Sequence, residues 1–159
     1  MSQKYVIVHF IDKVKVPEEF PASEWPLHVT LLANFRIAKL DLLKDRLADY
    51  ARQTKPLTIS ASGEALFGPN KNVEVSLIQP DTGIVELHNK LLSIVFKLGA
   101  VFDEPNFNGT GFRPHATIQI KSRLQDKEIV NLDSLSLVDM YPNNEISRRR
   151  IIETYKLKG

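Results

Sequence analysis

Two short segments of the chain repeat one pattern, and this repetition constrains the fold more than any other feature of the sequence. They read LHVTL at 27–31 and PHATI at 114–118. Each alternates polar with apolar residues, as a strand does when one of its faces is covered and the other is open. The fold is therefore expected to include two strands that each carry a histidine and a threonine on the same face.

Loops that contain proline precede both segments. Residues 13–26 include Pro17, Pro21 and Pro26, and each proline fixes φ and removes a backbone donor, so no long helix or strand is expected there. Residues 103–114 are rich in Asn, Gly and Pro. We expect each His-x-Thr strand to follow such a loop, which is a pseudo-duplicated arrangement rather than a sequence repeat.

Runs of β-branched and aromatic residues predict the strands. We expect them at residues 5–11, 27–35, 57–66, 72–78, 115–120, 135–141 and 150–157. The first should be buried in the centre of its sheet, because most of its residues are apolar. Turns at 68–70 and 142–144 should join the third strand to the fourth and the sixth to the seventh.

Two segments have the apolar spacing of amphipathic helices. Leucine and isoleucine recur at three- and four-residue steps in residues 39–53 and 82–98. Gly99 is expected to end the second helix, because glycine tolerates the left-handed backbone that commonly follows a helix. The whole pattern predicts an α+β sheet protein with two principal helices.

Composition narrows the class of protein. A length of 159 residues with 43 % hydrophobic content suits one domain over residues 1–159 with a sizeable core. The 19 acidic and 21 basic residues give a formal net charge of +2, which excludes binding through a basic tail but permits a local cationic groove. Cysteine is absent, so a disulfide framework, a thiol nucleophile and a thiolate metal site are excluded. The apolar run at 5–11 is too short for a signal peptide or a spanning helix, so we expect a soluble, cytoplasmic protein with no membrane partner.

The repeated motif supplies the groups that phosphodiester cleavage needs. One proton must leave the attacking oxygen and another must reach the departing oxygen, and His28 and His115 could transfer both. An ordinary imidazole has a pKa of about 6.5, so near neutrality one can be neutral and the other protonated at little cost. Thr30 and Thr117 could donate hydrogen bonds to the phosphate oxygens. This chemistry requires no metal ion or other cofactor, and the symmetrical motifs leave open which histidine is the acid.

A simpler interpretation is that both histidines only complete the structure of their strands. One His-x-Thr pattern is weak evidence, because three-residue patterns arise by chance and a half-buried strand often carries a histidine. Here the pattern occurs twice, each copy has a proline within the two preceding residues, and each lies on a predicted strand. We therefore favour a catalytic pair.

With these two motifs the chain resembles the 2H phosphoesterase superfamily, which includes 2′,5′ RNA ligase-like proteins and cyclic nucleotide phosphodiesterases. The matching residues are His28-Val29-Thr30-Leu31 and His115-Ala116-Thr117-Ile118, and the predicted order of elements agrees over nearly the full length. The resemblance implies a bilobal, pseudo-twofold fold in which two antiparallel sheets face a central cleft and helices lie outside. It also implies 2′,3′-cyclic phosphate or 2′,5′-linked substrates. The loop before the first motif is short and has no predicted helix, so the subfamily stays open.

Aromatic and cationic residues near the motifs are candidates for binding the rest of a nucleotide. Phe112 could stack on a base and Arg113 could meet a phosphate, although simple loop packing or solvent exposure explains both equally well. Trp25 precedes the first motif and could line the cleft or cap the core. Phe67 and Phe107 are weaker candidates of the same kind.

The remaining histidines and cations receive structural interpretations. His9 could reach the floor of the cleft, but a packed core or edge position is favoured, and His88 is expected at the surface of its helix. Residues 148–150 are three arginines, which we expect to be solvated or paired with Glu145 and Glu153. Lys121 is expected to be a solvated charge.

Three hypotheses for function follow. The first is an enzyme that cleaves, or reversibly joins, phosphodiesters bearing a ribose 2′-oxygen at RNA ends, in nucleotides or in short oligonucleotides, with a nuclease for cyclic or 2′,5′-linked signalling oligonucleotides as its variant. The second is a nucleotide-binding module without turnover. The third, a histidine metal site, ranks last because the motif strands carry no neighbouring carboxylate. A monomer is expected.

Overall fold

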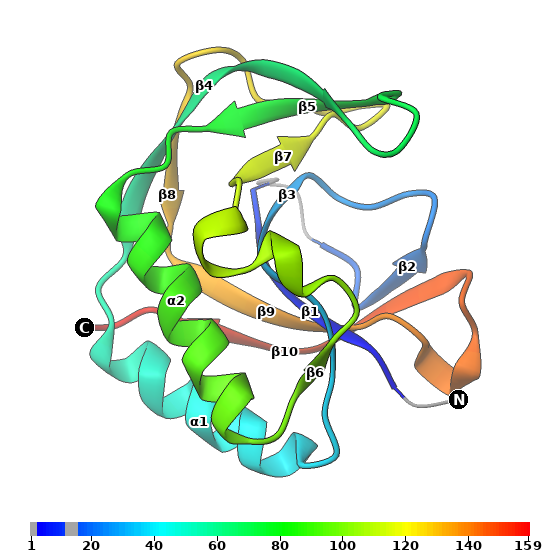
Figure 1. Cartoon of the computed structure of the whole chain (residues 1–159), viewed down its shortest axis with the longest axis vertical. Coiled ribbons are helices and arrows are strands. Elements are labelled where there is room, and N and C mark those ends of the chain that lie inside the picture. Colours follow the sequence, from blue (N-terminus) through cyan, green and yellow to red (C-terminus); the bar gives the residue numbers. More distant parts are fainter. Residues whose placement is uncertain (1–2, 12–15) are drawn as a thin grey trace.

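All strands in the part of the chain that the structure describes, residues 3–11 and 16–159 of a computed structural model, belong to two antiparallel sheets (Figure 1). The larger sheet has the strand order β2-β10-β9-β1-β3-β6. Its strands are β1 (Tyr5–Phe10), β2 (Glu19–Pro21), β3 (His28–Arg36), β6 (Val101–Phe102), β9 (Ser134–Asp139) and β10 (Arg148–Lys156).

The smaller sheet has the strand order β7-β5-β4-β8. Its strands are β4 (Leu57–Phe67), β5 (Val73–Ile78), β7 (His115–Thr117) and β8 (Ile129–Leu132). β4 and β5 form the predicted hairpin, and Gly68 has a φ of +93° in the turn between them, where a side chain would be strained.

β1 occupies the predicted central position, between β9 and β3. Its residues from Tyr5 to His9 are all buried, as expected for a strand covered on both faces. Because Phe10 is paired with His28, the end of β1 lies beside the start of β3. The centre of the sheet therefore supports the first motif.

Both predicted helices are present. α1 (Leu40–Gln53) buries Leu43 and Leu47, and α2 (Thr82–Lys97) buries a longer face that includes Leu87 and Leu91. The two helices lie side by side on the outside, α1 against β10 and α2 against β3 (Figure 1). Gly99 has a φ of +84° directly after α2, which confirms the expected stop.

The strand predictions were wrong in two respects. β2, β6 and β8 were not expected, because strands of two to four residues are too short to show a clear alternation. β7 ends at Thr117 instead of residue 120. It is an edge strand, and its chain turns away where the Gln119 N–H donates to the Ser122 carbonyl oxygen.

These elements confirm the expected α+β class, with two antiparallel sheets, helices outside and a cleft between the lobes. β3 and β7 belong to different sheets but contact each other, so the two motifs meet where the lobes meet. One cluster of buried apolar residues runs through both sheets and beneath both helices. Among the described residues, no helix is long and apolar enough to cross a membrane.

Candidate active site

The four motif residues lie on the two strands that meet at the cleft. His28 and Thr30 lie on β3, and His115 and Thr117 lie on β7, all partly exposed, while Val29 and Ala116 between them are buried. The alternation predicted from the sequence is therefore present in both strands. The two imidazoles lie close enough for a positive charge on His115 to lower the pKa of His28.

A backbone carbonyl determines the tautomer of each motif histidine. His28 Nδ1 donates to the carbonyl oxygen of Pro26 over 2.8 Å, and His115 Nδ1 donates to that of Arg113, also over 2.8 Å. A carbonyl oxygen can only accept, so Nδ1 carries a hydrogen in both protonation states of each ring. Nε2 is then the nitrogen that gains or loses a proton, as a general acid or base requires.

Burial shifts the proton affinity of both histidines in the same direction. It lowers the pKa of His28 to about 4, against a smaller opposing effect of the hydrogen bond to Pro26. Burial also lowers the pKa of His115, and the Arg113 guanidinium lowers it further, while the hydrogen bond to the Arg113 carbonyl raises it. Burial therefore favours the neutral form of both imidazoles, so protonating either ring costs more than an ordinary pKa of about 6.5 implies.

Each motif histidine packs against an aromatic ring from its own lobe. The centroid of Trp25 is 4.4 Å from that of His28, and the centroid of Phe67 is 4.6 Å from that of His115. The Arg113 guanidinium lies 4.6 Å from the centre of the Phe67 ring, in a cation–π contact. Both imidazoles are thus held between a backbone carbonyl and an aromatic side chain.

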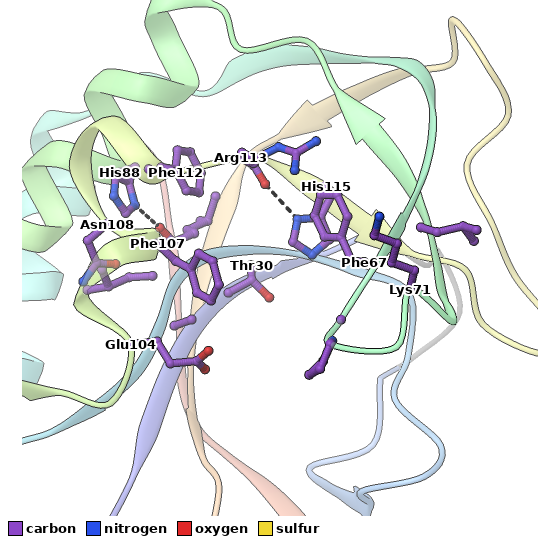
Figure 2. Close-up of a pocket in the computed structure, with 17 residues that line it drawn as sticks. Thr30, Phe67, Lys71, His88, Glu104, Phe107, Asn108, Phe112, Arg113 and His115 are labelled. Carbon is purple, nitrogen blue, oxygen red and sulfur yellow. Dashed lines mark hydrogen bonds between the residues drawn. The ribbon is translucent and has the colours of Figure 1, made fainter.

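A cavity of about 610 Å³ opens beside the second motif (Figure 2). Thr30 and His115 line it together with four of the five predicted substrate-binding residues, namely Phe67, Phe107, Phe112 and Arg113. Lys71, Glu104 and Asn108 add polar groups to its wall. The volume lies within the range of small-molecule sites in proteins, and three aromatic rings with a few polar groups are a typical lining.

Trp25 does not line this cavity. It packs between Phe10 and Phe20, at centroid distances of 6.5 and 5.0 Å, and its other neighbour is His28. It also borders a second, smaller hollow of about 280 Å³, together with Lys121. The structure therefore places Trp25 as support for the first imidazole, and its contact with substrate stays a prediction.

His88 was wrongly expected at the surface. It is only 1 % exposed, its Nδ1 donates to the Leu31 carbonyl oxygen over 2.7 Å, and its Nε2 accepts from the Gly109 N–H over 2.9 Å. Its ring stacks on Phe112 with a centroid distance of 3.9 Å and an interplanar angle of 1° (Figure 2). The sequence contained a signal for this, because residue 88 lies four residues after Ile84 and so on the same helix face.

His88 thus joins α2 to both parts of the site. Its first hydrogen bond reaches β3 next to Thr30, and its second reaches the loop that carries Phe112 and leads to His115. The opposite roles of the two nitrogens require a neutral ring, and burial lowers the His88 pKa accordingly. Sequence reasoning missed this residue as a connection between the motifs.

The predictions for His9 and Lys121 are confirmed. His9 is 4 % exposed and its Nδ1 donates to the Ser134 carbonyl oxygen, which confirms a packed core histidine. Lys121 is exposed, as expected. Within residues 3–11 and 16–159, no three His, Asp or Glu side chains lie together as a metal site would require.

The partners expected for the arginine run were wrong. Arg148 and Arg150 pair with Glu19 of β2, not with Glu145 or Glu153, and Arg149 donates to three backbone carbonyls. β2 pairs with β10 so that Glu19 lies opposite Arg150, and this pairing places the Glu19 carboxylate beside these arginines. The run therefore stabilises the edge of the sheet.

Comparison with known proteins agrees with the motifs and the fold. The family model of the 2′-5′ RNA ligase superfamily matches residues 5–135, which include both motifs and most of both sheets. The chain belongs to this superfamily. The expected resemblance to the 2H phosphoesterase superfamily is thereby confirmed, and membership supports an enzyme with phosphoesterase or RNA ligase-like activity.

Individual relatives of the superfamily are distant. A Bacillus licheniformis protein named as a putative phosphoesterase is 26 % identical over 134 residues, which cover 83 % of this chain and 70 % of that protein. Escherichia coli LigT, in a structure complexed with 3′-AMP, matches with a TM-score of 0.62 at 16 % identity and covers 100 % of both chains. The Thermus thermophilus protein TT0787 matches with a TM-score of 0.60 at 20 % identity and covers 98 % of both chains. These structural matches establish the shared fold.

Proposed function

We propose that the protein is a metal-independent phosphodiesterase that cleaves 2′,3′-cyclic phosphates or 2′,5′-linked RNA-type phosphodiesters, or joins such ends in the reverse direction. The observation that carries this proposal is the matched pair of histidines, each bound through Nδ1 to a carbonyl oxygen two residues earlier. Each ring therefore has Nε2 available in a defined tautomer for proton transfer. General acid–base cleavage of a phosphodiester needs two such groups.

The difference in burial suggests how the pair divides its task. His28 is the group whose pKa falls to about 4, so it is neutral at physiological pH and suited to take a proton as the general base. His115 then donates a proton to the departing oxygen. For a cyclic phosphate, a water oxygen attacks phosphorus and gives its proton to His28, and the ribose oxygen that leaves takes the His115 proton.

A bound phosphate supplies the charge that the unliganded site lacks. Burial favours the neutral form of both imidazoles in the free protein, because it lowers the pKa of each. A phosphodiester carries a negative charge, and this charge next to His115 favours the imidazolium form. The Thr30 and Thr117 hydroxyls, on the same faces as the histidines, would donate to the non-bridging oxygens. Substrate binding would therefore help to protonate the acid.

The cavity beside His115 suits a nucleoside attached to that phosphate. Phe67, Phe107 and Phe112 provide aromatic surface for a base, and the Arg113 guanidinium would contact the phosphate as a cation. Relatives with the same fold support this assignment, because Escherichia coli LigT was solved in complex with 3′-AMP and also with phosphate. The predicted partners, RNA ends and short oligonucleotides, present such nucleosides.

The decisive experiment is turnover of 2′,3′-cyclic nucleotides and 2′,5′-linked oligonucleotides in the presence of EDTA. Native protein should be active, and His28→Ala and His115→Ala should each lower kcat by about 10²- to 10⁴-fold. Circular dichroism would confirm that both variants are folded. Activity that disappears with EDTA would contradict the metal-independent mechanism.

Binding without turnover is the competing function. It predicts that nucleotides bind with unchanged affinity to His28→Ala and His115→Ala, and that native protein forms no product from any compound in the panel. The nuclease variant of the proposal is tested by adding cyclic and 2′,5′-linked signalling oligonucleotides to the panel. Fastest cleavage of one of these compounds would favour that variant.

A further inference from the structure

The smaller hollow beside the first motif is separate from the main cavity in its lining. Its residues come from the loop before β3 and from the turn after β7, whereas the main cavity uses residues after His28 and before His115. It is lined by Ser23, Glu24, Trp25, Gln119, Ile120, Lys121 and Ser122. At about 280 Å³ it has less than half the volume of the main cavity, about 610 Å³.

Both ends of the hollow adjoin the motifs. Trp25 packs on the His28 ring at 4.4 Å between centroids, and Gln119 donates through Nε2 to the Thr117 carbonyl oxygen over 3.1 Å. The main cavity reaches the motifs through the other two members, Thr30 and His115. Each hollow therefore adjoins both motifs, and a phosphate bound between the motifs would have both hollows beside it.

The lining of the hollow has the mixed character of a nucleoside site rather than a phosphate site. Ile120 is 95 % exposed, which is unusual for an aliphatic side chain, and Trp25 adds aromatic surface beside it. Ser23 and Ser122 provide hydroxyls. The charges of Glu24 and Lys121 are opposite, so the hollow does not concentrate positive charge as a phosphate cradle would.

We propose that this hollow is a second nucleoside subsite, which holds the group that departs from the phosphorus when a linear 2′,5′-phosphodiester is cleaved. The inference rests on the proposed function and extends it. One nucleoside fills the main cavity, the phosphate lies between the motifs, and the second nucleoside lies against Ile120 and Trp25. In the cleavage step the neighbouring 3′-oxygen attacks phosphorus and gives its proton to one imidazole. The bond from phosphorus to the 5′-oxygen breaks, and that oxygen takes a proton from the other imidazole.

The subsite predicts a preference that the main cavity alone does not. A 2′,3′-cyclic mononucleotide has both ester oxygens on one ribose, so it occupies only the main cavity. A 2′,5′-linked dinucleotide reaches both hollows. Removing contacts in the smaller hollow should therefore change the ratio of kcat/KM for the dinucleotide to kcat/KM for the cyclic mononucleotide of the same base.

The test compares native protein with Ile120→Ser and Lys121→Ala, using Ile129→Ser as the matched control. Ile129 is also an exposed isoleucine, 70 % exposed, but it lies on β8 and lines neither hollow. Ile120→Ser should lower the kcat/KM ratio about tenfold, mainly through KM of the dinucleotide, because an apolar contact with the base is lost. Lys121→Ala should lower it by a smaller factor, and Ile129→Ser should leave it at the native value.

The outcomes separate the subsite from the proposed function. If native protein cleaves the cyclic mononucleotide but Ile120→Ser leaves the ratio unchanged, or changes it no more than Ile129→Ser does, the subsite is wrong and the phosphodiesterase stands. Cleavage of the cyclic compound without any cleavage of the dinucleotide has the same meaning. If neither compound is cleaved, the proposed function and the subsite both fail.

Discussion

The two halves of the candidate active site contain the same motif in two different environments. In both, a histidine at the start of a strand donates through Nδ1 to a carbonyl oxygen two residues earlier and packs on an aromatic ring. Around His28 the ring is Trp25, which is itself packed against Phe10 and Phe20. Around His115 the ring is Phe67, which lies in the cavity wall under the Arg113 guanidinium.

This difference teaches that identical motifs need not have identical proton affinities. Closer enclosure lowers the pKa of His28 to about 4, whereas His115 stands at the wall of an open cavity and its pKa is lowered by burial and by Arg113. A pair that transfers two protons in opposite directions benefits from such inequality. In the proposed mechanism the surroundings, rather than the motifs, distinguish the base from the acid.

The assignment of His28 as base and His115 as acid can be tested with a substrate that has a better leaving group. A nucleoside phosphodiester that releases 4-nitrophenolate needs no proton on the departing oxygen. His115→Ala should then lose less than about tenfold in kcat, whereas His28→Ala should still lose about 10²- to 10⁴-fold. If His28→Ala is the variant that recovers activity with this substrate, His28 is the acid and His115 the base. If neither variant recovers activity, the leaving group receives no acid assistance from either histidine.

The unequal burial of the two histidines should also appear in the pH dependence of stability. A folded-state pKa of about 4 for His28, against about 6.5 in an unfolded chain, means that the stabilising contribution is complete above pH 6.5 and is lost as pH falls towards 4. The loss is on the order of 3 kcal/mol for this group. Urea unfolding between pH 7 and 4 should show a shallower decline for His28→Gln than for native protein, and His115→Gln should show a smaller change of the same sign. Equal slopes in all three would contradict the unequal burial.

The aromatic partners of the histidines should differ in their effect on stability. Trp25→Ala should lower the free energy of unfolding by about 2–3 kcal/mol, because Trp25 packs on three rings. Phe67→Ala should lower it by less than about 1 kcal/mol and should mainly raise KM, because one face of Phe67 lines the cavity. Denaturant unfolding and steady-state kinetics on the same two variants test this contrast. A larger stability loss for Phe67→Ala would reverse it.

His88 anchors the loop before His115 through two hydrogen bonds, and two substitutions can separate their effects. His88→Asn keeps a donor near the Leu31 carbonyl but loses the acceptor for the Gly109 N–H, whereas His88→Gln places an acceptor near Gly109. One lost hydrogen bond corresponds to about a fivefold change, so His88→Asn should raise KM about fivefold with kcat nearly unchanged. His88→Gln should raise KM less. Equal KM values for the two variants would show that the anchor does not position the cavity wall.

Much of the fold and the central part of the site follow from local sequence patterns. The helices and the longer strands are predictable because their apolar pattern extends over six or more neighbouring residues, and the structure contains them. The two His-x-Thr segments are recognisable because the same motif occurs twice, and both lie on strands. Four of the five aromatic and cationic residues predicted near the substrate line the cavity. Phe112 and Arg113 do so because they directly precede the second motif, whereas Phe67 is brought there by the pairing of β4 with β5 and of β5 with β7.

The features that were missed depend on contacts between distant segments. β2 exists because Glu19–Pro21 pairs with β10, and the same pairing places Glu19 beside Arg148 and Arg150. His88 is buried because α2 packs on β3 and on the loop before β7, at residues 57 and 21 positions away in sequence. The helix period places His88 on the same face as Ile84, but periodicity in a single sequence does not reveal which distant segments that face meets.

The sequence by itself determined which groups could perform the chemistry: two imidazoles and two hydroxyls on matching strand faces, with no cysteine available. Only the tertiary structure decided that these strands meet, that Nδ1 of each ring is bonded to a backbone carbonyl, and that His28 is the more enclosed of the two. The physical reason is that the pKa of a group depends on the solvent, dipoles and charges around it. Those surroundings come from segments that only folding brings together.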